Sequence, residues 1–268
     1  MSIKIAAINI ASPSLARSHA LAAYFPTLDA DLIVLTETST GEGSAALFRW
    51  FYKQGWAGRI GECSHHERGT AVFARFELPV SPFRPADDYL PGRCLIVEVQ
   101  SSKGKISVVG MYLPTRGNDP TKLERKLRYM NAWGQLLQSM SYRAPTILIG
   151  DLNIVPQHQK PVGFPQLPFE YAWMSDLEEH QLHDLRRALG RAPEPTWISP
   201  QGEGYTFDHA LANAGARELT IGFDYRHDSR TSGVTDHSAI VVEIDAEPNF
   251  TAAKLSAVPL FPEQQTLF

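Results

Sequence analysis

The sequence predicts an α/β fold, in which short buried strands alternate with a few amphipathic helices. Short apolar runs that end on a polar residue recur along the chain, and each is typical of a buried strand. The runs 95–99 and 106–113 are separated only by a turn-like segment, which predicts antiparallel pairing. A stretch after Asp119 carries its apolar residues at helical spacing instead.

Length and composition indicate a soluble globular protein. The chain has 268 residues, of which 43% are hydrophobic and 20% charged, so we expect one domain over residues 1–245 and a flexible tail over 246–268. No apolar run approaches the roughly 20 residues of a membrane helix, and no signal-peptide core follows Met1. Two cysteines, Cys63 and Cys94, suit a reducing compartment, and we expect a cytoplasmic location.

The first third predicts two strands around one helix. Residues 3–10 form an apolar strand with Asn9 near its end, and residues 15–28 follow as a helix behind a Ser-Pro pair that suits a cap and a first turn. The apolar run 32–35 predicts the second strand, and Glu37 follows it. This Glu is either a solvated strand terminus or a metal ligand aimed into a cleft.

Further strands are predicted over residues 69–74, 95–99 and 106–113, and the last of these carries Tyr112 at its end. A tyrosine at a strand end usually has a structural role. The Asp-Pro pair at 119–120 then opens a helix, with Asp as the N-cap and Pro in the first turn. The buried stripe of this helix consists of Leu123, Leu127, Met130, Leu137 and Met140.

The strand predicted over residues 147–149 stops at Gly150 and delivers Asp151 and Asn153. Residues two apart on an extended segment point the same way, so we expect both side chains to face one cavity. A carboxylate there can deprotonate a water, and a carboxamide can donate to an oxyanion. The alternative is an ordinary turn, because Gly, Asp and Asn are turn residues.

The last third repeats the pattern of polar residues next to a strand. A helix is predicted over residues 174–189 and ends at Gly190, and a strand is predicted over residues 239–244. Asp236 and His237 come just before that strand. They are either surface polarity with a structural histidine or part of a site.

Charge is uneven although the formal net charge is only −4. Between residues 116 and 143, six basic residues outnumber two acidic ones: Arg116, Lys122, Arg125, Lys126, Arg128 and Arg143 against Asp119 and Glu124. This run is either a phosphate-facing patch, in which Arg116 contacts substrate, or the solvated face of a helix.

Together the polar strand ends indicate one site, because a fold that gathers polar residues where strands end is building a cavity for a ligand. They are Asn9, Glu37, Tyr112, Asp151 with Asn153, and Asp236 with His237. The set is poor in Cys and His, which disfavours zinc. The oxygen ligands of Glu37 and Asp236, with an Asn nearby, suit Mg²⁺ or Mn²⁺, which commonly serve phosphate chemistry.

In their order along the chain these motifs resemble the endonuclease/exonuclease/phosphatase superfamily, which has the deoxyribonuclease I-like fold. The resemblance covers residues 3–245 and rests on segments 5–9, 35–37, 110–114, 150–153, 205–209 and 235–238. It implies a four-layer α-β-β-α sandwich, with two mainly antiparallel sheets flanked by helices, and makes residues 1–245 the catalytic domain.

The resemblance also implies a role for each polar residue. Glu37 would hold the divalent cation, Asn9 would support it, and Asp236 would lie near the same cation. Asn9 would also contact the substrate.

On the reaction side, Asp151 would align and deprotonate the attacking water, while Asn153 would help to hold the phosphate. His237, oriented by Asp208, would donate to a phosphate oxygen as negative charge develops there.

Within the superfamily the chain is most similar to the exonuclease III and abasic-site endonuclease branch. Tyr112 stands where that branch places a tyrosine and is expected to act in the catalytic site; Tyr205 stands where it can carry an aromatic that lines the lesion pocket. Three positions depart from the pattern. Ala11 replaces an acidic residue, Thr115 replaces Asn, and residues 206–207 lack the usual basic residue before the motif Asp. The loss at Ala11 weakens a second cation position.

The end of the chain, residues 264–268, resembles the pentapeptide by which bacterial DNA polymerases and repair proteins dock on the replicative sliding clamp. Gln264, Leu267 and Phe268 would be the anchors of this short linear motif. The alternative is a frayed terminus with an apolar tip.

We therefore expect a Mg²⁺- or Mn²⁺-dependent nuclease of DNA repair, exonuclease III-like or abasic-site endonuclease-like, that hydrolyses phosphodiesters by direct water attack. It would bind DNA as a monomer, with the sliding clamp as a partner and no membrane contact. Two rivals stay open: a phosphodiesterase or phosphatase that acts on RNA, nucleotides or phospholipids, and a clamp-tethered DNA-binding module with weak catalysis.

Overall fold

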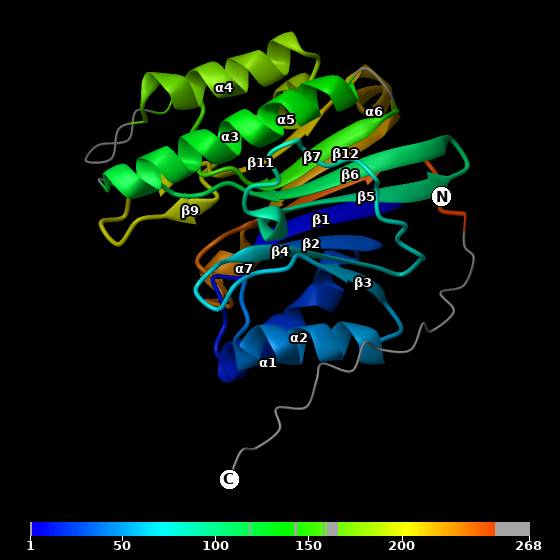
Figure 1. The fold of residues 1–268 in the computed structure, drawn as a ribbon. Coiled ribbons are helices and arrows are strands. Elements are labelled where there is room, and N and C mark those ends of the chain that lie inside the picture. Colours follow the sequence, from blue (N-terminus) through cyan, green and yellow to red (C-terminus); the bar gives the residue numbers. More distant parts are fainter. Residues whose placement is uncertain (1, 118, 142–143, 158, 160–165, 250–268) are drawn as a thin grey trace.

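The protein folds into four layers, with helices outside and two β-sheets face to face between them (Figure 1). The structure is a computed structural model and describes residues 2–117, 119–141, 144–157, 159 and 166–249. The predicted α/β class and the expected sandwich are both confirmed. Among the described residues, no helix is long and apolar enough to cross a bilayer.

One sheet has the strand order β12-β13-β1-β2-β4-β3, and only the β1–β2 pair is parallel. Its strands are β1 (Ile3–Asn9), β2 (Leu32–Thr38), β3 (Ala57–Ile60), β4 (Gly69–Ala74), β12 (Thr220–Arg226) and β13 (Ala239–Ile244). The second sheet has the order β5-β6-β7-β11-β8, and only β6–β7 is parallel. It consists of β5 (Cys94–Ser101), β6 (Gly104–Tyr112), β7 (Thr146–Asp151), β8 (His183–Asp184) and β11 (Asp208–Ala212).

Long helices cover the outer face of each sheet. Helices α1 (Leu15–Tyr24) and α2 (Glu42–Lys53) lie under the first sheet, and α3 (Pro120–Ser141) and α4 (Pro168–Glu179) lie over the second (Figure 1). The smaller elements are the two-stranded ribbon β9 (Trp197–Ile198) and β10 (Gly204–Tyr205), the helices α5 (Leu185–Ala188), α6 (Ala214–Leu219) and α7 (Asp228–Thr231), and two 3-10 turns, Phe25–Leu28 and Pro91–Arg93.

Three apolar cores separate the four layers. Side chains alternate across each strand, so Ile5 of β1 enters the core between the two sheets while Ile8 packs toward α1 and α2. Likewise Ile149 of β7 enters the central core and Leu148 the core under α3. Because both faces of these strands are covered, their sequences read as unbroken apolar runs.

The helix predicted over residues 174–189 is wrong. The chain forms α4, then the short strand β8, then α5. Helix α4 begins at Pro168, where the Glu170 carboxylate accepts a hydrogen bond from the Leu167 backbone N–H. It ends before Gln181, whose left-handed φ of 74° breaks the helical path. Only the stop at Gly190, with a φ of 65°, is confirmed.

Past β13 the chain continues along the β5–β6 hairpin. Ala246 is buried, the Glu247 N–H donates to Ser102 Oγ, and the Asn249 N–H donates to the Gln100 carbonyl. Residues 246–249 therefore pack on the domain. The docking anchors Gln264, Leu267 and Phe268 lie outside the described residues.

Candidate active site

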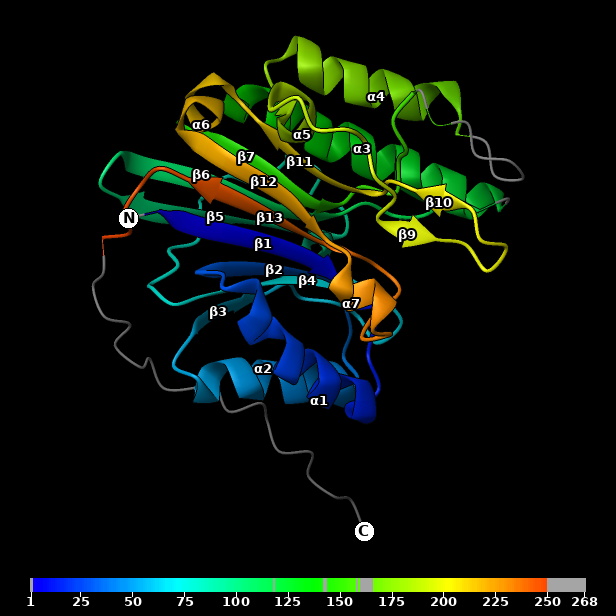
Figure 2. The same cartoon turned by 180° about the vertical axis from the view of Figure 1, so that it is seen from behind.

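The predicted polar residues gather where the strands of both sheets end. In the second sheet Asp151 is paired in register with Tyr112 of β6 on one side and with Asp208 of β11 on the other, so the three form one row. The first sheet brings Asn9 at the end of β1 and His237 just before the neighbouring strand β13. This end of the sandwich is the one at which β9, β10 and α7 lie, and α6 lies at the opposite end (Figure 2).

An irregularity in β2 directs Glu37 into the site. The pairing of β2 with β4 shifts between Thr36 and Thr38, and Glu37 takes a left-handed φ of 54°. Ser12 holds this strained backbone, because its N–H (2.9 Å) and its hydroxyl (3.0 Å) both donate to the Glu37 carbonyl. In this position Oε1 of Glu37 accepts hydrogen bonds from the Tyr112 hydroxyl and from Nδ2 of Asn9, each at 3.0 Å.

Asn9 connects the two carboxylates that come from opposite sheets. Its Nδ2 donates to Glu37 Oε1 and, at 2.8 Å, to Asp151 Oδ2. Its Oδ1 accepts from the Ala11 N–H at 2.8 Å. Asn9 therefore orients Glu37 and Asp151 through its amide nitrogen, which is a supporting position for a cation site.

Asp151 is buried among other acidic groups. Burial raises its pKa, and the nearby charges of Asp208 and Glu37 add to this effect against the opposing charge of His237, so the pKa rises from 3.8 to about 7. Its Oδ1 accepts from the Asn153 N–H at 2.9 Å. A carboxyl group with this pKa takes up and releases a proton near neutral pH, as a general base requires.

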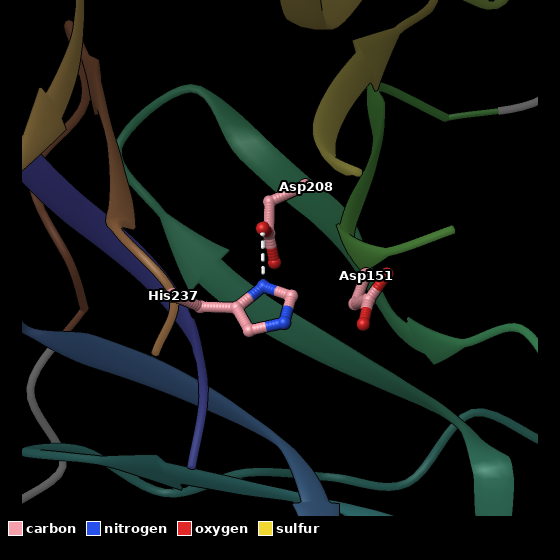
Figure 3. Close-up of side chains that lie close together, drawn as sticks. All are labelled: Asp151, Asp208 and His237. Atoms are coloured by element: carbon pink, nitrogen blue, oxygen red, sulfur yellow. Dashed lines mark hydrogen bonds and ion pairs between the residues drawn. The ribbon is translucent and has the colours of Figure 1, made fainter. Parts of the chain in front are cut away.

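His237 lies between Asp208 and Asp151 (Figure 3). Its Nδ1 donates to Asp208 Oδ2 at 2.8 Å, and both residues are buried. Burial alone lowers the pKa of His237, but the charge and hydrogen bond of Asp208 and the charges of Asp151 and Asp236 outweigh it and raise the pKa to about 10. The ring is therefore an imidazolium whose second N–H can donate to an anionic oxygen.

Tyr112 keeps its proton at physiological pH. Burial, together with the charges of Glu37 and Asp151, raises the pKa of its hydroxyl well above 10. The guanidinium of Arg93 stacks over its ring at 4.5 Å. Tyr112 is thus a fixed hydrogen-bond donor to Glu37.

The donor set fits a hard divalent cation. Carboxylates of Glu37 and Asp151 converge on the same Asn9 amide, and oxygen ligands of this kind are those that Mg²⁺ and Mn²⁺ prefer. One potential ligand atom each from Asp151, Asp208 and His237 also lies within 4.8 Å of the others. We favour the Glu37 and Asp151 pair, because a protonated His237 bound to Asp208 repels a cation.

Asp236 faces a different neighbour from the one expected. Its Oδ2 accepts from the indole Nε1 of Trp197 at 3.0 Å, and its Oδ1 accepts from the Thr235 hydroxyl at 3.4 Å. Trp197, Tyr205 and Phe207 pack on one another with ring centroids 5.8–6.1 Å apart. Tyr205 thus belongs to an aromatic wall that reaches Asp236.

The expected alternation of Asp151 and Asn153 along one extended strand is wrong. Strand β7 ends at Asp151, and Asn153 has a left-handed φ of 49°. Nδ2 of Asn153 donates to the Leu113 carbonyl at 2.9 Å. The segment is a turn, as the alternative held, but a turn that keeps Asn153 directly beside Asp151.

Two members of the basic run are internal. Nε of Arg116 donates to Glu170 Oε2 at 3.0 Å, and Nζ of Lys126 donates to Glu170 Oε1 at 2.5 Å and to the Asn153 carbonyl at 2.9 Å. All three side chains are at most 8% exposed. The sequence signal for this network is the place of Lys126 within the apolar stripe of its helix, three residues after Leu123.

Comparison with known proteins identifies the family to which this fold and these motifs belong. The model of the Endonuclease/Exonuclease/phosphatase family matches residues 6–237. An AP endonuclease from Archaeoglobus fulgidus has a similar structure, with a TM-score of 0.73 and 18% identity over 91% of this chain and 99% of its own.

Two structures from Neisseria are similar as well. A 3′-5′ exonuclease from Neisseria meningitidis has a TM-score of 0.74 and 20% identity over 91% of this chain and 100% of its own. A 3′ phosphatase from Neisseria bound to a product DNA hairpin has a TM-score of 0.72 and 21% identity over 91% and 99%. At these identities the likeness establishes the shared fold.

Proposed function

The chain belongs to the Endonuclease/Exonuclease/phosphatase family, and from that premise we propose that it is a divalent-metal-dependent nuclease that hydrolyses phosphodiesters of DNA. The observation that carries the proposal is the contact between the sheets at their strand ends. There Asn9 connects Glu37 to Asp151, and His237 donates to Asp208. A carboxylate pair beside an imidazolium is suited to bind a phosphate group and to activate a water next to it.

The residues divide the reaction between them. Asp151 accepts the proton of the attacking water, and the Asn9 amide and the Asn153 N–H hold its carboxylate in place for this. His237 donates its free N–H to a non-bridging phosphate oxygen and offsets the charge that develops there, while Asp208 keeps the ring in place. Glu37 and Asp151 would hold Mg²⁺ or Mn²⁺, which when bound polarises the phosphate and lowers the pKa of water.

DNA is the substrate that the comparisons support best, since the similar structures are those of an AP endonuclease, a 3′-5′ exonuclease and a 3′ phosphatase with a DNA hairpin. The aromatic wall of Trp197, Tyr205 and Phe207 offers ring faces on which an unpaired sugar or base can stack. Within the family we assign the chain to the exonuclease III and abasic-site endonuclease branch, with DNA repair as its role.

A panel of end-labelled oligonucleotides tests the proposal. It holds intact, nicked, gapped and abasic duplexes, a duplex with a 3′-phosphate end, single-stranded DNA and RNA, each with Mg²⁺, Mn²⁺ or chelator. We expect metal-dependent cutting of at least one DNA substrate, and the product ladder then separates endonuclease from 3′-5′ exonuclease. Cutting of RNA with every DNA left intact, or no cutting of any DNA, would overturn the proposal.

A further inference from the structure

A hollow of about 510 Å³ opens beside the catalytic residues, and the mechanism above does not use it. Its walls come from the loop after β1, helix α1, strand β9, helix α7 and the loop before β13. The lining residues that matter here are Ala11, Arg17, Ile198, Arg230, Thr235 and Asp236.

The hollow carries more positive than negative charge. Among the residues that the structure describes, neither Arg17 nor Arg230 forms an ion pair. The charged residues that line the hollow are therefore two arginines and one aspartate, Asp236, whose carboxylate already accepts the Trp197 indole N–H. This balance repels a cation and attracts an anion.

The two arginines are fixed differently. Arg17 donates to the backbone carbonyls of Ile10 (3.0 Å), Ala11 (3.2 Å) and Val234 (3.4 Å), so its charge is held at the wall. Within the described part of the chain, the Arg230 side chain forms one hydrogen bond, from Nε to Ser238 Oγ at 3.3 Å. Its two terminal nitrogens therefore keep their N–H groups for a ligand, and such a fork matches a phosphate.

The hollow shares its walls with the catalytic residues. The Ala11 N–H donates to Asn9 Oδ1, the Thr235 hydroxyl donates to the Asn9 carbonyl at 2.7 Å, and Asp236 directly precedes His237. An anion held there therefore lies next to the reacting group of the same substrate molecule. Ala11, which also lines the hollow, contributes only a methyl group to its wall.

We propose that Arg230 and Arg17 form a second phosphate subsite, which binds a phosphate group of the substrate strand next to the one that is hydrolysed. This inference rests on the proposed function, because it takes the substrate to be a DNA strand, in which the phosphate next to the hydrolysed one is always present. The bound group is either an internal phosphodiester or a phosphate at a strand end. Its role is to fix the register of the strand before cleavage.

Substitution of single phosphates by uncharged methylphosphonates tests the subsite. A series of oligonucleotides carries one methylphosphonate at each phosphate position of the strand in turn, and a second series carries or lacks a terminal phosphate. Binding is measured by fluorescence anisotropy in chelator, with the wild-type chain, Arg230→Ala, Arg230→Lys and Ala11→Asp. Arg217→Ala, an exposed position on α6 at the far end of the sandwich, is the matched charge control.

We expect one modified position to weaken binding by the wild-type chain about ten-fold, the factor that about 1.4 kcal/mol represents. Arg230→Ala should bind unmodified DNA about ten-fold more weakly and be insensitive to the modification at that one position, and Arg230→Lys should recover part of the loss. Ala11→Asp adds a carboxylate to the hollow, leaves both arginines in place, and should show the same loss and the same insensitivity.

The subsite would be overturned if each methylphosphonate weakened DNA binding by the same factor in Arg230→Ala as in the wild-type chain, with both proteins folded and equal in melting temperature. The series separates this inference from the proposed function. If Arg230→Ala abolishes the sensitivity to one modified position but no metal-dependent cleavage is seen, the subsite is supported and the nuclease is contradicted. If the DNA is cleaved but Arg230→Ala keeps the wild-type sensitivity at every position, only the subsite is contradicted. Sensitivity confined to the terminal-phosphate series identifies a strand end as the ligand.

Discussion

At the scale of single residues, Asp151 sets a pH dependence that denaturation can measure. Its pKa lies near 7 in the folded protein, whereas an unperturbed aspartate has a pKa of 3.8, so the folded state binds the proton more tightly. The stabilisation is fully present below about pH 4 and is lost as the pH rises through about 7. His237, whose raised pKa stabilises the fold up to higher pH, loses its contribution only between about 6.5 and 10.

We therefore predict that, in chelator, the free energy of unfolding attributable to Asp151 falls by about 2 kcal/mol between pH 4.5 and pH 6.5. Urea denaturation of the wild-type chain and of Asp151→Asn at both pH values measures this as a difference. Carboxyl groups distant from Asp151 titrate alike in both proteins, so their contributions cancel in the difference. Equal pH dependence in the two proteins would show that Asp151 has an ordinary pKa.

The hydroxyl of Tyr112 is expected to support cation binding through Glu37. Tyr112→Phe removes the hydroxyl that donates to Glu37 Oε1 and leaves the ring under Arg93. Loss of such an orienting bond costs about 10–100-fold in metal affinity or activity, so we expect the Mn²⁺ concentration for half-maximal cleavage to rise about ten-fold. An unchanged metal titration with normal folding would mean that Glu37 is not a cation ligand.

The polar residues that the structure gathers at the strand ends could be selected from the sequence, because each lies next to an apolar strand. Their local geometry could not. Glu37 reaches the site because the pairing of β2 is irregular, and Asn153 lies beside Asp151 because its backbone is left-handed. Asp236 accepts a hydrogen bond from Trp197. Each depends on backbone conformations of residues that propensity does not single out.

At the scale of elements, helices α3 and α4 are joined to the catalytic turn by buried charges. Lys126 donates to Glu170 and to the carbonyl of Asn153, and burial lowers the pKa of the lysine. Lys126→Met leaves the Asn153 carbonyl without this donor, and leaves Glu170 with Arg116 and the Leu167 N–H as its remaining donors. We predict a loss of about 3–5 kcal/mol in the free energy of unfolding, measured in urea.

Lys122→Met is the matched control, because Lys122 is exposed one turn earlier on the same helix. It should change stability by less than about 0.5 kcal/mol. A Lys126→Met protein as stable as this control would show that the buried network does not hold the turn.

Strand and helix positions were predictable where periodicity was strong, as in β1, β7 and α3. Helix α2 and strand β3 were not predicted; the N-cap residue of α2 is Gly41, which has no side chain to form a capping hydrogen bond. The end of α4 at Gln181 had no turn residue to mark it, so one helix was predicted where α4, β8 and α5 exist.

At the scale of the whole molecule, the two-sheet sandwich brings together residues from both ends of the chain. The apolar pattern does not say which sheet a strand joins, and the insertion of β13 between β12 and β1 is what carries His237 to Asn9. The layers followed from the resemblance of ordered motifs rather than from periodicity. Proposals for residues 250–268 rest on sequence alone.

For the tail we predict that deletion of residues 264–268 leaves cleavage of short oligonucleotides unchanged and abolishes binding to a bacterial sliding clamp. Binding of the full-length and the shortened chain to surface-immobilised clamp measures this directly. A Leu267→Ala and Phe268→Ala double variant is the control of equal length. Clamp binding that survives both changes would contradict the docking motif.

The central claim is that Asp151 and His237 act in metal-dependent phosphodiester hydrolysis. The most direct measurement is the single-turnover cleavage rate of a DNA substrate by wild type, Asp151→Asn and His237→Ala, with Mg²⁺ or Mn²⁺ and with chelator. We predict cleavage only with metal, and a rate lower by about 10²–10⁴ in each variant. Cleavage at wild-type rate by either variant, or no cleavage by the wild-type chain, would contradict the account.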